Sequence, residues 1–168
     1  MKILFLTSRL PYPPDQGDRL RAFNILQVLS ADHEIDLVTF VDGPVKVDSR
    51  KTLEKVCNRV ETVALSKNKS YTHAAQGILS SDPLQVWYYR DNQMENLIEE
   101  MSSKGGYDVV YSHLFRVFPY AQLVKGAYNL VDFTDVVSRE TLQAVPYRQW
   151  FLRSVYRMEA TRIRRYEK

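Results

Sequence analysis

The chain begins with the stretch that decides its fold, Lys2-Ile3-Leu4-Phe5-Leu6-Thr7-Ser8-Arg9-Leu10-Pro11-Tyr12-Pro13-Pro14-Asp15-Gln16-Gly17-Asp18-Arg19-Leu20-Arg21. The apolar run from Ile3 to Leu6 is continuous rather than alternating, which is typical of a parallel strand covered by helices on both faces. The prolines that follow cannot continue a strand, so we expect a loop, and helical spacing of apolar residues resumes at Ala22. Because ligands bind beyond the carboxyl ends of strands in open α/β sheets, this loop is the first candidate functional segment.

Strand and helix signals alternate along the rest of the chain. Further strands are predicted over 34–41, 61–65, 107–112 and 128–133, and helices over about 18–31, around 72–79, after Asp91 and near 121–124. Parallel strands need crossover helices, so this order predicts an α/β fold of about six βα units. The expected architecture is a Rossmann-like, doubly wound, mostly parallel sheet with helices on both faces.

Three segments carry weaker signals. Asp48 is placed to cap a helix that holds Leu53, Val56 and Cys57. Asp82 begins a stretch that we expect to be irregular, with the aromatic residues 87–89 partly exposed. The only cysteine, Cys57, excludes an internal disulfide framework, and its apolar neighbours at helical spacing predict a buried core thiol.

Composition bounds the class of protein. The 168 residues suit one globular domain with a real core, since 45% are hydrophobic and 26% are charged. The short apolar start lacks a cleavage pattern for a signal peptide, and no apolar run approaches the ~20 residues that span a bilayer. We therefore expect a cytoplasmic protein.

Charge is concentrated at the end of the chain. Residues 147–168 hold seven basic residues against two acidic ones, so this segment carries +5 and the preceding residues carry −2. A generally basic surface for nucleic acid is thus not indicated. An apolar stripe of Leu152, Tyr156, Ala160 and Ile163 predicts a basic amphipathic helix with no stop signal, so we expect the native sequence to continue. The expected division is 1–146 and 147–168.

The first loop lacks the Gly-x-Gly-x-x-Gly fingerprint of dinucleotide sites and the Gly-Lys-Ser/Thr end of a P-loop, which disfavours classical NAD and ATP sites. Gly17 nevertheless lets backbone N–H groups approach a ligand, and the helix that follows offers its positive end to an anion. The alternative is that Gly17 permits a turn and Asp18 caps the helix. Arg9, Arg19 and Arg21 can each pair with a phosphate or a carboxylate, and the alternative is that they stay solvated.

His113 follows the strand over 107–112, so we expect it at the carboxyl edge of the sheet, where it can donate to a substrate hydroxyl or act as a general base. The alternative is a structural role, which we expect for His33 and His73. Asp132, Asp135 and Ser138 follow the last strand and can bind sugar hydroxyls. Helix capping by Asp135 or its neighbour Thr134 is the competing interpretation. Neither metal-site spacing nor an Asp-x-Asp pair is present, so no metal ion is expected.

Three segments together resemble the N-terminal half of bacterial family 4 glycosyltransferases. They are Leu10–Arg19, Tyr107–His113 and Leu130-Val131-Asp132-Phe133-Thr134-Asp135-Val136-Val137-Ser138. The similarity covers nearly the whole chain, and these enzymes have the GT-B architecture, in which two Rossmann-like domains face each other across a cleft.

The resemblance implies a retaining glycosyltransferase of cell-envelope polysaccharide synthesis that moves a sugar from a nucleotide-sugar to a glycan or lipid-linked acceptor, usually without a metal or other cofactor. It places His113 near the transferred sugar as the catalytic residue. The implied donor-phosphate and substrate-binding residues are Gly17, Asp18, Arg19, Arg116, Asp132, Asp135 and Ser138. Most nucleotide contacts in this family come from a C-terminal domain, so we expect these 168 residues to be inactive by themselves.

Two hypotheses remain beside each other. The chain is the acceptor-binding domain of such an enzyme, or it is a non-catalytic Rossmann-like module that binds a nucleotide or a partner protein. The basic helix over 147–168 either packs against a further domain or contacts an anionic membrane, which would place the protein at the inner membrane face. Nucleic-acid binding is not expected, because basic and stacking aromatic residues are not combined on a predicted sheet face.

Overall fold

The computed structural model describes residues 1–134 and 136–167, which form two compact units. Unit 1 comprises Met1–Ser66 and Asp91–Asp132, and unit 2 comprises Lys67–Arg90 and Phe133–Lys168. The expected boundary at residue 146 concerned a further domain and stays a prediction.

Unit 1 contains one parallel sheet in the order β3-β2-β1-β4-β5. Its strands are β1 (Lys2–Thr7), β2 (Glu34–Val41), β3 (Arg59–Ala64), β4 (Val109–His113) and β5 (Tyr128–Asp132). The expected Rossmann-like α/β fold is confirmed. The five strands of the described sheet are those that the sequence predicts, although about six βα units were expected. The strands from the first half of the chain lie on one side of β1 and those from the second half on the other.

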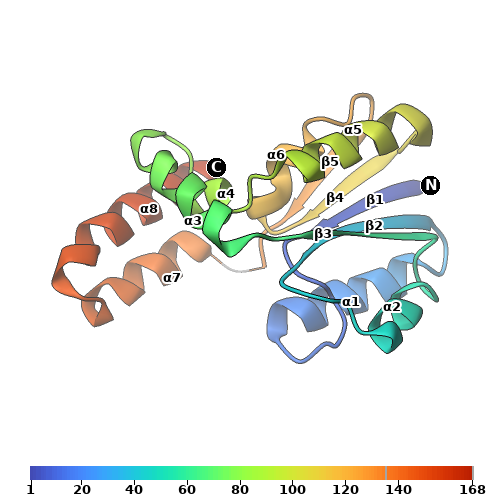
Figure 1. The fold of residues 1–168 in the computed structure, drawn as a ribbon, viewed down its shortest axis with the longest axis horizontal. Helices are drawn as coiled ribbons and strands as arrows, with labels where there is room; N and C mark the ends of the chain where they lie inside the picture. The colour runs from blue at the N-terminus through green and yellow to red at the C-terminus, as the bar shows by residue number, and fades with distance from the viewer. Residues whose placement is uncertain (135, 168) are drawn as a thin grey trace. The chain divides into compact units, whose positions relative to one another are not determined.

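Helices cover both faces of this sheet (Figure 1). They are α1 (Gly17–Leu29) and α2 (Val47–Leu53) on one face, and α5 (Asn92–Gly105), the short helix η2 (Phe115–Val117) and α6 (Phe118–Ala121) on the other. Successive strand residues point to opposite faces of the sheet. Phe5 therefore belongs to the same core cluster as Leu26 of α1, whereas Leu4 and Leu6 lie on the other face. All three β1 side chains are completely buried, which explains the continuous apolar run.

The ends of two helices follow their sequence signals to different degrees. Asp91 caps α5, accepting hydrogen bonds from the N–H groups of Gln93 and Met94, and Gly106 ends the helix at a φ of 57°. The expected helix through Cys57 is wrong, because α2 ends at Leu53 and the chain turns there to enter β3. Asp48 lies inside the first turn of α2 rather than at its cap.

Cys57 is buried as expected, with 6% of its surface exposed. Burial, together with the charge of Asp36, raises the pKa of its thiol to about 12. A thiol with such a pKa is almost entirely protonated at neutral pH and is therefore a poor nucleophile.

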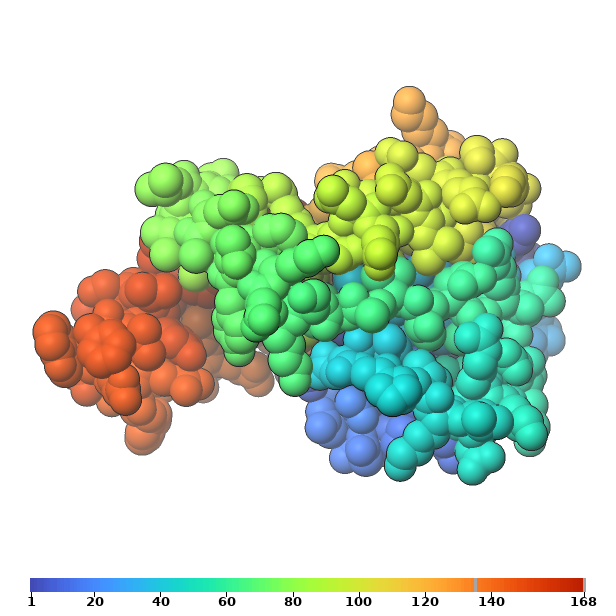
Figure 2. All heavy atoms as spheres, viewed as in Figure 1, coloured from blue at the N-terminus to red at the C-terminus, as the bar shows by residue number. Residues whose placement is uncertain are grey.

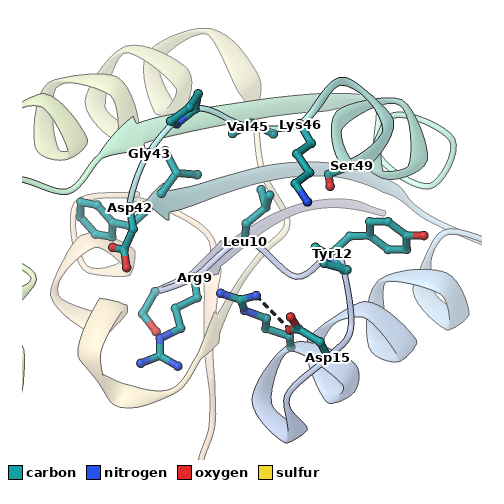
Figure 3. Close-up of a pocket in the computed structure, with 15 residues that line it drawn as sticks. Arg9, Leu10, Tyr12, Asp15, Asp42, Gly43, Val45, Lys46 and Ser49 are labelled. Carbon is teal, nitrogen blue, oxygen red and sulfur yellow. Dashed lines mark hydrogen bonds and ion pairs between the residues drawn. The ribbon is translucent and has the colours of Figure 1, made fainter.

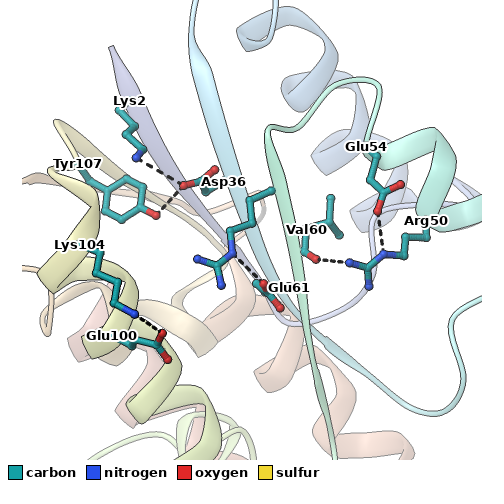
Figure 4. Close-up of polar contacts among 10 residues, drawn as sticks. Lys2, Asp36, Arg50, Glu54, Val60, Glu61, Glu100, Lys104 and Tyr107 are labelled. Carbon is teal, nitrogen blue, oxygen red and sulfur yellow. Dashed lines mark hydrogen bonds and ion pairs between the residues drawn. The ribbon is translucent and has the colours of Figure 1, made fainter.

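Polar contacts close the amino-terminal edge of the sheet (Figure 4). The carboxylate of Asp36 accepts a 2.7 Å hydrogen bond from the Tyr107 hydroxyl and lies 4.0 Å from the Lys2 ammonium. Burial and this hydrogen bond to Asp36 raise the pKa of Tyr107 above its usual value. On the neighbouring strand, Arg59 pairs with Glu61 at 2.8 Å. These groups satisfy one another, so the amino-terminal edge is a structural part of unit 1.

Unit 2 is helical. Its elements are α3 (Lys67–Gln76), η1 (Gly77–Leu79), α4 (Leu84–Tyr88), α7 (Val137–Ala144), η3 (Val145–Tyr147), η4 (Trp150–Leu152) and α8 (Arg153–Tyr166), with α7 and α8 packed side by side. Two predictions were wrong here. The segment expected to be irregular forms α4 and buries Tyr89, and the terminal helix begins at Arg153 rather than near residue 147.

Two buried charged residues of α8 contact the segment Lys67–Arg90 of unit 2. That segment is green in Figure 2, and the later part of unit 2 is orange to red. Glu159 accepts hydrogen bonds from the N–H groups of Leu84 and Gln85 in the first turn of α4. Arg162 donates to three carbonyl oxygens in and just after η1, those of residues 77, 78 and 82. The Gly77 oxygen also accepts from the N–H of Ser80, so Arg162 is its second donor. Glu159 meets N–H groups of a first helical turn, where a negative charge is favoured.

Candidate functional site

The polar side chains of unit 1 gather where the order of its strands reverses. From β1 the chain proceeds to β2 and β3 on one side, whereas β4 and β5 lie on the other, and the last residues of β1 and β4, Thr7 and His113, are paired. The loops that follow two such strands run in opposite directions, which leaves room for a ligand between them. This edge is therefore the candidate site.

His113 occupies the centre of that edge, with 4% of its side chain exposed. Its Nε2 lies 3.1 Å from the carbonyl oxygen of Asp18 at the start of α1. A carbonyl can only accept, so Nε2 carries the proton and Nδ1 carries a lone pair. Nδ1 has no hydrogen-bond partner among the described residues and lies 3.6 Å from Oδ2 of Asp132.

Burial lowers the pKa of His113 below its usual value, although the nearby charge of Asp132 opposes the shift. The imidazole is thus neutral at neutral pH, with its proton committed to Asp18. The distance of 3.6 Å between Nδ1 of His113 and Oδ2 of Asp132 is consistent with two acceptor atoms that share no proton. In this arrangement His113 joins the end of β4 to the first turn of α1.

Asp132 forms the second part of the site. Its two oxygens accept hydrogen bonds of 2.9 and 2.8 Å from Nε and Nη2 of Arg21, and Oδ2 accepts one of 2.8 Å from the Tyr111 hydroxyl. Burial alone would raise the pKa of Asp132, but these donors and the charge of Arg21 lower it below its usual value. The result is an ionised carboxylate with its main acceptor positions occupied, while half of the Arg21 side chain is exposed.

The backbone after His113 adopts an uncommon conformation. Leu114 has a φ of 72° and a ψ of 148°, a backbone conformation that residues other than glycine rarely adopt. Its N–H donates to the carbonyl oxygen of Asp132, which fixes β4 against β5 beyond the end of the regular pairing. Such conformations cost of order 1–3 kcal/mol and concentrate at functional sites.

Gly17 begins α1 on the exposed side of the site. A Cβ built on it would meet no heavy atom of the described chain within 4 Å, and its φ is not positive. The N-cap of α1 is Gln16, and Asp18 lies in the first helical turn, with its carboxylate 3.7 Å from Arg9. Neither a strained turn nor a capping contact therefore accounts for these two residues. The open N–H groups of this turn suit an anion.

A separate cavity of about 300 Å³ lies between the proline loop and the segment after β2 (Figure 3). Tyr12 and Asp15 face Lys46 and Ser49 across it. Arg19 lines this cavity and pairs with Asp15 at 3.0 Å. The cavity combines positive and negative side chains, which suits a polar ligand that carries hydroxyl groups.

The other expected residues are distributed differently. Arg116 lies half-buried in η2, three residues after His113. Ser138 belongs to unit 2, where both its N–H and its hydroxyl donate to the carboxylate of Glu167. Asp135 lies outside the described residues. The structure therefore brings together Asp18, His113 and Asp132, with Gly17 beside them.

Two members of the site, Tyr111 and Leu114, are not predicted from the sequence. Arg21 is predicted to pair with a phosphate or a carboxylate, and the structure shows that its partner is Asp132. Tyr111 precedes His113 by two residues, so its position on β4 was available from the strand pattern. Its bond to Asp132 was not, because that contact depends on the pairing of β4 with β5.

Among residues 1–134 and 136–167, no group of three His, Cys, Asp or Glu side chains is arranged to hold a metal ion. Comparison of the chain with protein-family models, with curated proteins and with solved structures finds no match. The case for a function therefore rests on the site itself and on the resemblance of the three segments.

Proposed function

We propose that this chain is the acceptor-binding domain of a retaining glycosyltransferase that uses a nucleotide-sugar donor. In the proposed reaction the bond from the sugar C1 to the donor phosphate breaks, and a bond from C1 to an acceptor hydroxyl oxygen forms on the same face. The hydroxyl proton leaves with the nucleoside diphosphate. A C-terminal domain, as in the enzymes that the three segments resemble, would supply most contacts to the nucleotide.

The observation that carries this proposal is the exposed first turn of α1 beside a preorganised polar group at the strand-order reversal. Gly17 leaves space for a diphosphate at open backbone N–H groups. Arg21, next to it on α1, adds a half-exposed positive charge that Asp132 orients. His113 fixes Asp18 and so positions the same turn. The proline-loop cavity is then a candidate place for the acceptor.

A non-catalytic binding module is the second candidate, and one observation favours it. His113 directs Nε2 to a backbone carbonyl, and Asp132 is occupied by Arg21 and Tyr111. In this arrangement both side chains are engaged in hydrogen bonds with neighbouring residues. A site held in this way can bind a ligand without catalysing a reaction. A second Rossmann-like domain encoded after residue 168, together with sugar transfer that His113→Ala abolishes, would support the enzyme over the module.

Donor binding is tested by calorimetric titration of the 168-residue chain with UDP-glucose and GDP-mannose. Gly17→Ala should weaken binding of the preferred nucleotide-sugar at least about fivefold, because a methyl group then occupies the space of the phosphate and one backbone hydrogen bond is lost. The fold should be unaffected, since the added Cβ meets no atom.

Gly43→Ala is the matched control. Gly43 is also exposed and also lacks a Cβ neighbour within 4 Å in the described chain. It follows β2 and lines the cavity proposed for the acceptor, so Gly43→Ala separates that cavity from the phosphate contact at α1. Binding that Gly43→Ala weakens more than Gly17→Ala would place the phosphate elsewhere. No binding of either nucleotide-sugar at millimolar concentration would remove the support for a donor contact in this unit.

A further inference from the structure

The connection between α7 and α8 carries large aromatic side chains on the outside of unit 2. We refer to residues 145–153 as the aromatic tip; it lies at one end of the α7–α8 pair (Figure 1). Tyr147 is 90% exposed, Trp150 81% and Phe151 55%. Such exposure of three neighbouring aromatic residues is unfavourable in water and typical of an interaction surface.

The aromatic tip is held in shape by its own contacts. The side chain of Val145 is buried within unit 2. The Arg153 guanidinium donates hydrogen bonds to the carbonyl oxygens of Pro146 and Arg148. The guanidinium of Arg148 in turn lies over the ring of Tyr156, 4.7 Å from its centre. The rings are therefore presented by a fixed loop, so little conformational entropy is lost when they are buried by a partner.

Charge identifies the partner. Unit 2 holds eleven Lys and Arg residues against five Asp and Glu residues, a net charge of +6, whereas unit 1 carries −3. Residues 145–158 contain three arginines and no acidic residue. The acidic residues Glu159 and Glu167 of the terminal segment face inward, towards Leu84 and Ser138. The surface around the aromatic tip is thus positive.

We propose that the aromatic tip docks unit 2 onto the surface of an anionic lipid bilayer. Trp and Tyr side chains favour the headgroup region, where one end of the ring system is apolar and the other is hydrated. Arginines beside them attract anionic headgroups and extend their charged ends to the water. None of the helices in the described part of the chain is long and apolar enough to cross a membrane, so the contact is made from one side.

Two features favour a bilayer over other partners. Trp150 and Phe151 meet edge to face at 89°, so they offer no parallel rings for stacked bases. The apolar stripe expected on the terminal helix is not the docking surface, because Ala160 and Ile163 are buried inside unit 2. The aromatic tip therefore carries the contact, and the inference does not depend on the proposed glycosyltransferase activity.

The test is co-sedimentation of the chain with vesicles of phosphatidylcholine and phosphatidylglycerol at a ratio of 7:3, and with phosphatidylcholine alone. The chain should bind the anionic vesicles at least about fivefold more tightly, since each cation near such a surface contributes this much. Trp150→Ala with Phe151→Ala should reduce binding at least about tenfold, and Arg157→Gln about fivefold. Trp150 fluorescence should shift to shorter wavelength on binding.

Tyr128→Ala is the matched control for Tyr147→Ala, because Tyr128 is 84% exposed on β5 of unit 1. Circular dichroism must show that the tip variants fold, which their exposure predicts. Equal binding to both kinds of vesicle, or equal losses with Tyr128→Ala and Tyr147→Ala, would overturn the proposal. Dimerisation that depends on Trp150, or binding of polyuridylate RNA without vesicle binding, would assign the aromatic tip to another partner.

Discussion

Unit 1 and unit 2 are stabilised in opposite ways. In unit 1 the sheet interior is apolar on both faces, and polar side chains collect at the two edges of the sheet. In unit 2 the charged residues Glu159 and Arg162 are buried, whereas Tyr147 and Trp150 are exposed. The usual distribution of residue types is followed in the first unit and partly inverted in the second.

The difference shows what each unit has to satisfy. Strands satisfy their backbone groups within the sheet, so unit 1 needs apolar bulk to cover it and has polar residues to spare for a site. The short helices of unit 2 leave N–H and C=O groups at their ends without a partner in the same helix, and buried charges of α8 pair with such groups at Leu84 and Ile78. Its large apolar residues are then available for a surface.

The largest effect is expected when a buried apolar side chain of unit 1 is shortened. Leu6 is completely buried in β1, so Leu6→Ala should lower the free energy of unfolding by about 2–5 kcal/mol. Leu142→Ala in unit 2, where 55% of the side chain is exposed, should cost less than about 1 kcal/mol. Urea unfolding followed by circular dichroism measures both. Similar losses from the two variants would contradict the contrast between the units.

The second test breaks the buried charge contacts of unit 2. Arg162→Met removes a donor from three backbone carbonyl groups, of which that of Gly77 keeps a second one, and should cost about 2–3 kcal/mol. Hydrogen exchange should show this loss at amides of α3, α4 and α8, with the strands of unit 1 still protected. Arg157→Met, at an exposed position of the same helix, should stay within about 0.5 kcal/mol. Uniform loss of protection across the chain would show that the units do not open separately.

The smallest expected effect is an opposite pH dependence of the two units. The folded pKa of His113 lies below its unfolded value, so its contribution is present above about pH 6.5 and is lost as the pH falls. Burial raises the folded pKa of Glu159, so its contribution is present below about pH 4.5 and is lost as the pH rises through the folded pKa.

Hydrogen exchange between pH 4.5 and pH 7 can follow both trends in one sample. His113→Gln should flatten the trend of the strands in unit 1, and Glu159→Gln should flatten that of the helices in unit 2. A pH response of unit 1 that survives in His113→Gln would assign it to a different group.

The sheet could be predicted from the sequence because its signals are local. Apolar runs and the Pro, Gly and Asp residues between them placed the strands within about two residues, and Asp91 and Gly106 marked the ends of α5. Unit 2 was harder because Glu159 and Arg162 contact backbone groups 74 to 85 residues away. The spacing of residues within a short segment cannot predict such contacts, so the segment that forms α4 was predicted to be irregular.

The residues of the candidate site also differ in whether local sequence signals predict them. His113 and Asp132 were recognised because each ends a strand, and the carboxyl ends of parallel strands share one edge. The pairing of Arg21 with Asp132 joins residues 111 positions apart and depends on side-chain conformations that the pattern does not contain. The left-handed backbone at Leu114 carries no sequence signal, since leucine rarely adopts it.

The most direct test of the account is an NMR titration of the ¹⁵N-labelled chain with UDP-glucose and GDP-mannose. We expect the largest shifts of amide resonances at Gly17, Asp18 and Leu114, on both sides of the strand-order reversal between β1 and β4. Gly17→Ala should remove most of these shifts. Shifts confined to unit 2, or no shifts at saturating nucleotide-sugar, would contradict the assignment of this edge as the ligand site.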